Sequence, residues 1–321
     1  MTSVLRRAVA PIAAVTALVA TLSACGTGPS QVNSAVIIDD HVISVDEVQS
    51  LIDEVVKEPA ARPLAEQHKL DLVAREVVSQ LITHELLTEV AREENLRVDQ
   101  SQLSLLREQD PFGQELPTDG SVPADQLVPA LVNRARGFDA YANDNLLLME
   151  LANRYLGRAD VKYNVAGVTD YDDAKTLAQK IVANPDNGPS LMRAASAEDL
   201  PPQLNSATGP GPLALQLMVP DDSVLLINQP ATAQSAGSFF VVQVLSKDIA
   251  SSASPEFDPS QVDPSQLPQY GKYLLREQAI DKNIRVSPRY GEWNLAEMKV
   301  LPKAEADVAG LLLLPEEADK P

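Results

Sequence analysis

Cysteine and histidine are scarce in this chain, and their scarcity excludes several kinds of site. Cys25 is the only cysteine among 321 residues, so no intramolecular disulfide supports the fold. The three histidines, His41, His68 and His84, all lie in the first third of the sequence. Because the sequence contains no HExxH motif, no cysteine pair and no acidic calcium loop, we expect no metal site and no cofactor.

Basic and aromatic residues are also few. The chain has 26 lysines and arginines against 45 aspartates and glutamates, which gives a net charge of −19 at pH 7. Nucleic-acid phosphates are bound by clustered lysine and arginine, so we expect no nucleic-acid partner. Aromatic residues make up 4% of the chain, which disfavours aromatic-lined carbohydrate grooves. Hydrophobic residues, at 45%, suffice for a sizeable core, and the length favours two domains.

Motifs for catalysis are missing as well. No Gly-x-Ser-x-Gly turn marks a serine nucleophile. The segment TGPGP at 208–212 is rich in glycine, but its prolines lack the backbone N–H groups that a phosphate-binding loop needs. The sequence therefore gives no support to an enzyme.

The start of the chain has the layout of a secretory signal peptide. Arg6 and Arg7 form a short basic head, and residues 8–24 carry no charge. This apolar run is shorter than the roughly 20 residues that span a bilayer, and Pro11 interrupts it. We therefore expect residues 1–24 to be a cleaved signal peptide.

The end of this segment, formed by Leu22, Ser23, Ala24 and Cys25, resembles the lipobox of bacterial lipoproteins. The resemblance implies that Cys25 carries a diacylglyceryl thioether, that cleavage occurs just before it, and that the new N-terminus is acylated, for example with palmitate. Two or three acyl chains anchor a protein stably. The alternatives are an ordinary signal with an incidental cysteine and an uncleaved membrane anchor. If Cys25 is lipidated, residues 25–33 form a lipidated tether, and we expect the protein to face the extracytoplasmic side of the cell membrane.

The region 34–157 is predicted to be mostly helical. A short strand at 35–38 precedes a capping box, in which Ser44 is followed by Glu47 and then by apolar residues at helical spacing. Residues 64–95 carry a wide apolar band that predicts one long helix. Further helices are expected before the end of this region.

The pattern changes beyond this helical region. Residues 158–249 combine apolar strand patterns with a capped helix, which predicts a small α+β domain. A linker rich in proline and serine is expected over 250–269. A helix and a strand are predicted over 270–300, and a flexible tail over 301–321. The predicted fold class is α+β, mainly α.

This layout resembles that of the SurA-type periplasmic chaperones, relatives of the PrsA and PpiC foldases. The family's opening strand, turn and first helix are similar to AVIIDDHVISVDEVQSLIDE, residues 35–54, and its long helix is similar to LDLVAREVVSQLITHELLTEVAREENLRVDQSQL, residues 70–103. The closing strand of actinobacterial SurA-like lipoproteins resembles IRVSPRYGEWN, residues 284–294. The resemblance implies a SurA N-like helical domain over 34–157, completed by the C-terminal helix and strand of 270–300.

The middle region, 158–249, stands where the family has a parvulin-type prolyl isomerase. A parvulin's first strand and helix resemble VKYNVAGV and DDAKTLAQKIVANP, and its last strand resembles GSFFVVQVLSKD. Parvulins have histidines on the first and last strands, but here Asn164 stands at the first position and residues 85–321 contain no histidine. The usual Gly-Gly-Asp-Leu-Gly segment is reduced to TGPGPLAL. The resemblance therefore implies a degenerate, non-catalytic parvulin-like domain inserted into the helical one.

Together these features imply a membrane-anchored lipoprotein chaperone that binds unfolded or partly folded exported proteins without nucleotide. An apolar groove rimmed by charge would suit such weak, promiscuous binding. The sequence identifies no client-binding residue. Two alternatives are an active prolyl cis-trans isomerase with a divergent pocket and an assembly factor for one specific envelope partner.

Overall fold

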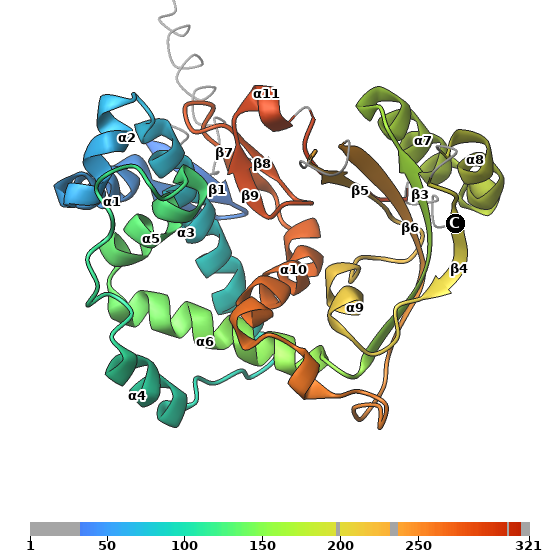
Figure 1. Ribbon diagram of the computed structural model, residues 1–321, viewed down its shortest axis with the longest axis horizontal. Coiled ribbons are helices and arrows are strands. Elements are labelled where there is room, and N and C mark those ends of the chain that lie inside the picture. Colours follow the sequence, from blue (N-terminus) through green and yellow to red (C-terminus); the bar gives the residue numbers. More distant parts are fainter. Residues whose placement is uncertain (1–32, 197–199, 232–236, 307, 316–321) are drawn as a thin grey trace, which may run out of the picture.

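The computed structural model describes residues 33–196, 200–231, 237–306 and 308–315. They form a mixed α+β structure that is mainly α, as the sequence predicts. Figure 1 shows a helical unit on the left and a twisted sheet on the right. Two helices of the later sequence lie between these units, namely α9 (Pro212–Gln216) and α10 (Leu267–Ile280).

The helical unit opens with a strand hairpin and a capped helix. In the cap, the Glu47 amide donates to the Ser44 hydroxyl over 3.0 Å, which satisfies a free backbone N–H of the first turn. The predicted single helix over 64–95 is wrong, because His68 adopts a left-handed backbone with φ of 56° and divides it in two. The elements of this unit are β1 (Ser34–Ile38), β2 (His41–Ser44), α1 (Val45–Lys57), α2 (Arg62–Glu66), α3 (Leu70–Glu93), α4 (Gln100–Gln109), α5 (Ala124–Arg136) and α6 (Phe138–Tyr155).

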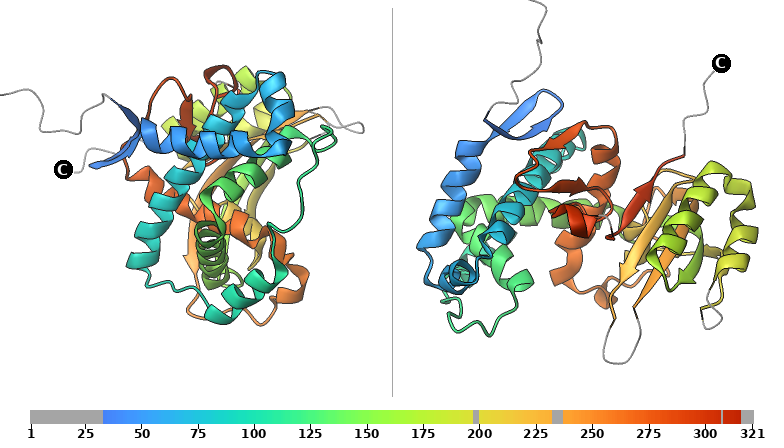
Figure 2. Two further views of the ribbon diagram at one scale, coloured as in Figure 1. Left: turned by 90° about the vertical axis from the view of Figure 1, so that its left-hand side faces the viewer. Right: turned by 90° about the horizontal axis from the view of Figure 1, so that it is seen from above.

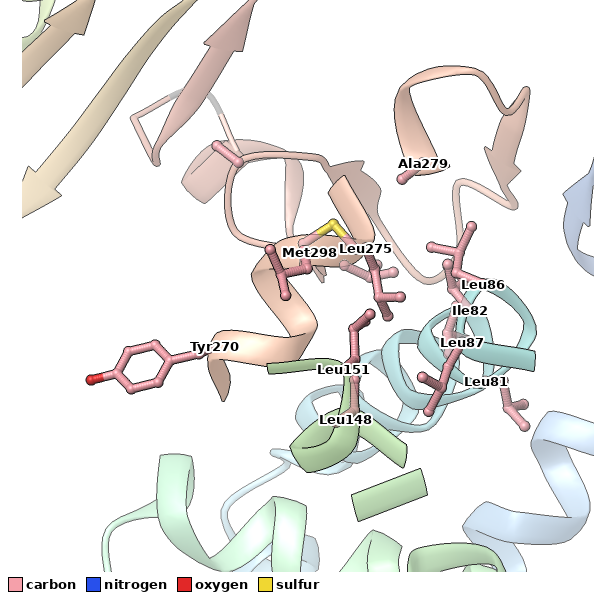
Figure 3. Close-up of a cluster of buried hydrophobic side chains, with 14 of the residues drawn as sticks. Leu81, Ile82, Leu86, Leu87, Leu148, Leu151, Tyr270, Leu275, Ala279 and Met298 are labelled. Carbon is pink, nitrogen blue, oxygen red and sulfur yellow. The ribbon is translucent and has the colours of Figure 1, made fainter. Parts of the chain in front are cut away.

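The C-terminal part of the chain returns to this unit and joins its core. Two 3₁₀ turns, Pro259–Gln261 and Pro264–Gln266, lead into α10, which lies against α6 and α3. Strand β7 (Ile284–Val286) then pairs antiparallel with β1 and gives the sheet order β2-β1-β7. Figure 3 shows the resulting cluster, which includes Leu81, Ile82, Leu86 and Leu87 of α3, Leu148 and Leu151 of α6, Leu275 of α10, and Met298.

The crossing of α10 and α6 depends on a glycine. A Cβ atom on Gly271 would lie 2.1 Å from the backbone oxygen of Leu148, so only a residue without a side chain fits at this position. This close approach brings the apolar faces of the two helices into contact. The C-terminal helix therefore completes the helical unit, and its backbone at Gly271 lies directly against the backbone of α6.

The middle region forms an antiparallel sheet in the order β10-β5-β6-β3-β4. Helices α7 (Tyr171–Ala183) and α8 (Gly188–Ala195) cover one face, and α9 lies on the other, toward α10. Core residues of α9 belong to the same cluster as those of the helical unit, so one apolar core continues from the bundle into the sheet. The strands are β3 (Ala159–Val168), β4 (Gln203–Ala207), β5 (Val224–Gln229), β6 (Ser238–Ile249) and β10 (Leu311–Leu313).

The flexible tail predicted for 301–321 is wrong for its described part. Strand β9 (Lys299–Leu301) pairs with β8 (Glu292–Asn294) in a hairpin that lies against α3. A short helix, α11 (Lys303–Ala306), follows, and β10 then pairs with β5 at the edge of the sheet. The right-hand view of Figure 2 shows this last strand, in red, beside the sheet. A leucine run read as a tail is thus a structural strand that links the two units.

The glycine at the helix crossing gives the first prediction. We expect Gly271→Ala to lower the free energy of unfolding by about 1–3 kcal/mol, the usual cost of overpacking. The better helix propensity of alanine, worth about 1 kcal/mol, acts in the opposite direction, so a net loss isolates the clash. Urea unfolding followed by the fluorescence of Trp293, the single tryptophan, measures it.

The matched control is Gly211→Ala. A Cβ at this position meets no atom within 4 Å, so the change in unfolding free energy should be small. Equal effects of the two substitutions would contradict the steric account of the crossing.

Candidate functional site

A polar pocket of about 240 Å³ lies where α3, α5, α6 and α10 meet. Several of its lining groups can both donate and accept hydrogen bonds. These are four side-chain amides and two hydroxyls, from Gln80, Thr83, Asn133, Tyr141, Asn145 and Gln269. The pocket combines residues far apart in the sequence, because α10 closes it.

The floor of the pocket is an ionic network centred on Asp144. Its carboxylate accepts from the Arg136 guanidinium over 2.6 Å and lies 2.7 Å from the Nδ1 atom of His84. Arg136 also donates to the Gln80 side-chain oxygen over 3.2 Å. The side chains of Asp144 and Arg136 are 13% and 8% exposed. Because both charges are largely removed from water, each one would destabilise the fold without its partner.

One signal for this network is present in the sequence, namely a carboxylate among the apolar residues of α6. Asp144 precedes Leu148 and Leu151 by four and seven residues, so it lies on the buried face of α6. A carboxylate at a core position requires a buried partner. That partner, Arg136, belongs to another helix, and only the fold identifies it.

The rim of the pocket keeps hydrogen-bonding capacity free. Among the described residues, Asn133 and Gln269 make no side-chain hydrogen bond, and Lys272 makes no ion pair. Burial lowers the pKa of Lys272, and the nearby Glu76 carboxylate partly opposes that shift. A rim of amides around a fixed ionic floor suits a ligand that itself donates and accepts, such as a polypeptide backbone.

An aromatic cluster adjoins the pocket through Tyr141. The ring of Phe112 lies 5.2 Å from that of Tyr141 and 6.3 Å from that of Phe138, measured between centroids. The guanidinium of Arg107 lies 5.3 Å from the Phe138 ring centroid, and that of Arg134 lies 5.9 Å from the Phe112 ring centroid. All three aromatic side chains are partly exposed, so apolar surface lies beside polar pocket groups.

In the middle domain, Asn164 and Gln243 form a buried amide pair across β3 and β6. The Asn164 amide donates to the Gln243 oxygen over 2.9 Å, and its own oxygen accepts from the Asn205 backbone over 2.8 Å. Gln243 in turn donates to the Pro185 carbonyl over 2.9 Å. Both side chains are fully buried and mutually satisfied, so the position that the resemblance assigns to a histidine presents no group to a substrate.

The three histidines lie on different elements and have different partners. His84 belongs to the ionic network, His41 lies 3.3 Å from the Glu85 carboxylate, and His68 occupies the turn before α3. No group of three or more potential metal ligands occurs in the described ranges.

The predicted lipidation residue, Cys25, and the lipobox residues Leu22, Ser23 and Ala24 lie outside the described residues. Of the helices that the structure describes, none is long and apolar enough to cross a membrane.

The ionic network gives a second prediction. We expect Asp144→Asn to lower the unfolding free energy by about 3–5 kcal/mol, because it leaves the buried Arg136 guanidinium without a counter-charge. The matched control is Asp139→Asn, which breaks the exposed pair with Arg107 and should cost about 1 kcal/mol or less. Urea unfolding of both variants measures the difference. A cost for Asp144→Asn as small as the control's would refute the proposed importance of the network.

A third prediction concerns pH. The hydrogen bond to Asp144 raises the pKa of His84 above 6.5, against the opposing effect of burial and of Arg136 and with a smaller contribution from Glu85. A raised folded-state pKa stabilises the protein below the unfolded pKa, and this stabilisation is lost as the pH rises through the folded value. We therefore expect the unfolding free energy to fall as the pH rises above about 6.5 and through the folded-state pKa of His84.

In His84→Gln this fall should disappear, whereas His68→Asn should retain it. The measurement is urea unfolding across the pH range, with the imidazole titration followed by nuclear magnetic resonance. A His84 pKa below the unfolded value would contradict the prediction.

Comparison with known proteins adds little to this geometry. No protein-family model and no curated protein matches the chain. The foldase protein PrsA from Streptococcus pneumoniae str. Canada MDR_19A is similar with a TM-score of 0.23 and 13% identity, over 78% of this chain and 94% of that chain. The foldase protein PrsA from Lactococcus lactis is similar with a TM-score of 0.21 and 13% identity, over 79% and 94%. Likeness at this level carries no argument about function.

Proposed function

We propose that this protein is a lipid-anchored chaperone that binds unfolded or partly folded exported polypeptides without nucleotide. The observation that carries the proposal is the amide-lined pocket beside the aromatic cluster of Phe112, Phe138 and Tyr141. Unfolded chains expose backbone amides and apolar side chains in every sequence. A surface that offers amides and aromatic rings side by side therefore binds them weakly and with little sequence preference.

The middle domain acts in this proposal as a binding or spacing module and not as an isomerase. A parvulin-like catalyst needs polar groups that reach a prolyl peptide. The side chains of Asn164 and Gln243 instead form hydrogen bonds with each other and with backbone groups. Their burial also keeps them from any substrate.

The anchor in this proposal is Cys25, lipidated after cleavage behind Leu22, Ser23 and Ala24. Only seven residues separate Cys25 from Asn33, the first described residue, so the tether would hold the helical unit close to the outer face of the membrane. Exported polypeptides emerge there unfolded. Labelling with a palmitate analogue, lost in Cys25→Ser, tests the anchor separately from client binding.

A fourth prediction tests client binding. The chain from residue 26 onward should suppress the aggregation of a denatured exported protein at near one-to-one stoichiometry, measured by light scattering. We expect Phe112→Ser to weaken this suppression about tenfold, because loss of one aromatic contact of about 1.4 kcal/mol corresponds to that factor. The matched control is Leu105→Ser on α4, an exposed apolar residue outside the cluster, which should have no effect.

The outcomes separate the possible functions. No suppression with several unrelated clients would overturn the chaperone proposal and favour recognition of one folded partner. Equal suppression by the Phe112→Ser variant and the unchanged chain would exclude the aromatic cluster as a client-binding surface. Turnover of a proline-limited peptide would show that the middle domain is an active isomerase.

A further inference from the structure

The edge of the middle-domain sheet is covered by a short, late segment of the same chain. Strand β5 pairs with β6 on one side and with β10 on the other. Without β10, β5 would be an edge strand whose free backbone N–H and C=O groups could pair with another extended chain. The structure thus shows both the edge and the kind of segment that fits it.

The covering strand is short and only partly buried. Its ladder with β5 joins three residue pairs, Leu311 with Leu226, Leu312 with Leu225, and Leu313 with Val224. Each of the three β10 leucines retains partial exposure. Just before the strand, the Asn294 side chain donates to the Gly310 carbonyl over 2.8 Å and holds the segment to the β8–β9 hairpin.

The free length of β5 exceeds the length that β10 uses. Residues Ile227, Asn228 and Gln229 of β5 pair with β6 but not with β10, and all three are exposed. The segment before β10 contacts this stretch through one side-chain bond, from the Asn228 amide to the Val308 carbonyl over 3.5 Å, and not through a backbone ladder. A longer extended segment could pair with six β5 residues where β10 pairs with three. It would therefore compete with β10 for the same edge.

The side chains around the edge define the class of ligand. Leu311 and Leu313 pack against the core that α7 covers, and Leu312 packs against the larger apolar core shared with the helical unit. Both faces of an added strand therefore meet apolar surface. Backbone pairing supplies affinity without sequence reading, and alternate side-chain positions select for apolar residues.

We propose that the β5 edge is a second polypeptide-binding site, for extended apolar segments of unfolded chains, which β10 occupies at rest. This inference rests on the proposed chaperone function, because the natural ligand of the β5 edge would be the unfolded client of that function. Residues 311–313 then serve as an internal pseudo-ligand that shields the edge until a longer apolar segment replaces them.

The test uses a fluorescent peptide with the sequence of residues 308–315, extended by lysines for solubility, and fluorescence anisotropy. In Leu312→Asp, a carboxylate facing the apolar core should weaken docking of β10 and tighten peptide binding at least tenfold relative to the unchanged chain. The matched control is Leu314→Asp, which adds the same charge outside β10 and should leave peptide binding unchanged. A chain ending at Ala309 is the second variant, and it should bind the peptide at least as tightly as Leu312→Asp.

Two outcomes would overturn the inference. One is no peptide binding by either β10 variant, and the other is equal binding by the unchanged chain and all variants. A peptide with prolines in place of the residues matching Leu312 and Leu313 should bind at least tenfold more weakly, because one of two successive N–H groups faces β5 and proline has none.

A competition arm keeps the two proposals distinguishable. Displacement of the peptide by a denatured exported client supports both. Suppression of client aggregation without displacement overturns the natural ligand proposed for the edge and leaves the chaperone function standing. Tight peptide binding without any suppression of aggregation supports the edge site and overturns the chaperone function.

Discussion

The crossing of α10 over α6 is the constraint on which the rest of the structure depends. It requires contact between Gly271 and the Leu148 backbone at a distance that no side chain permits. Everything between these two residues in the sequence, including strands β3 to β6 of the middle domain, is therefore a closed loop on the helical unit. Because the entropy of closing a loop grows only slowly with its length, an inserted domain costs little more than a short connection. The polar pocket exists only because α10 closes it.

The buried guanidinium of Arg276 couples this crossing to the middle domain. Arg276 of α10 donates to the Gln216 carbonyl at the end of α9 over 2.7 Å and to the Ala296 carbonyl beside the β8–β9 hairpin. Its guanidinium lies 4.3 Å from the Tyr273 ring centroid, and burial lowers its pKa to about 10. The planar guanidinium directs N–H groups on two separate nitrogens at the two carbonyls in fixed directions, whereas the ammonium of a lysine is a compact point charge. The two units thus share a polar tie as well as a continuous apolar core.

The sequence predicts the local features of this fold well and the long-range ones poorly. The capping box at Ser44 and Glu47 is visible because its partners are three residues apart. The partner of Asp144 lies on another helix, and the break at His68 interrupts an apolar band without altering its period. Strand β10 carries no alternation, since both of its faces meet apolar surface, so three leucines resemble a tail until β5 lies beside them. Sequence resemblance placed Asn164 correctly on the first strand of the middle sheet, but only the fold shows its hydrogen bonds to Gln243.

The two proposed binding surfaces have a consequence that neither has alone. The pocket lies in the helical unit and the β5 edge lies in the middle domain, and the shared core and Arg276 hold the two units together. An unfolded chain that binds weakly at one surface presents its other segments to the second at high effective concentration. Avidity of this kind raises affinity by roughly 10²- to 10⁴-fold without any sequence-specific contact. Each contact still dissociates quickly, so a client that begins to fold withdraws its apolar segments one at a time. A binder built in this way needs neither nucleotide nor a catalytic centre to release what it holds, because the folding of the client removes the ligand.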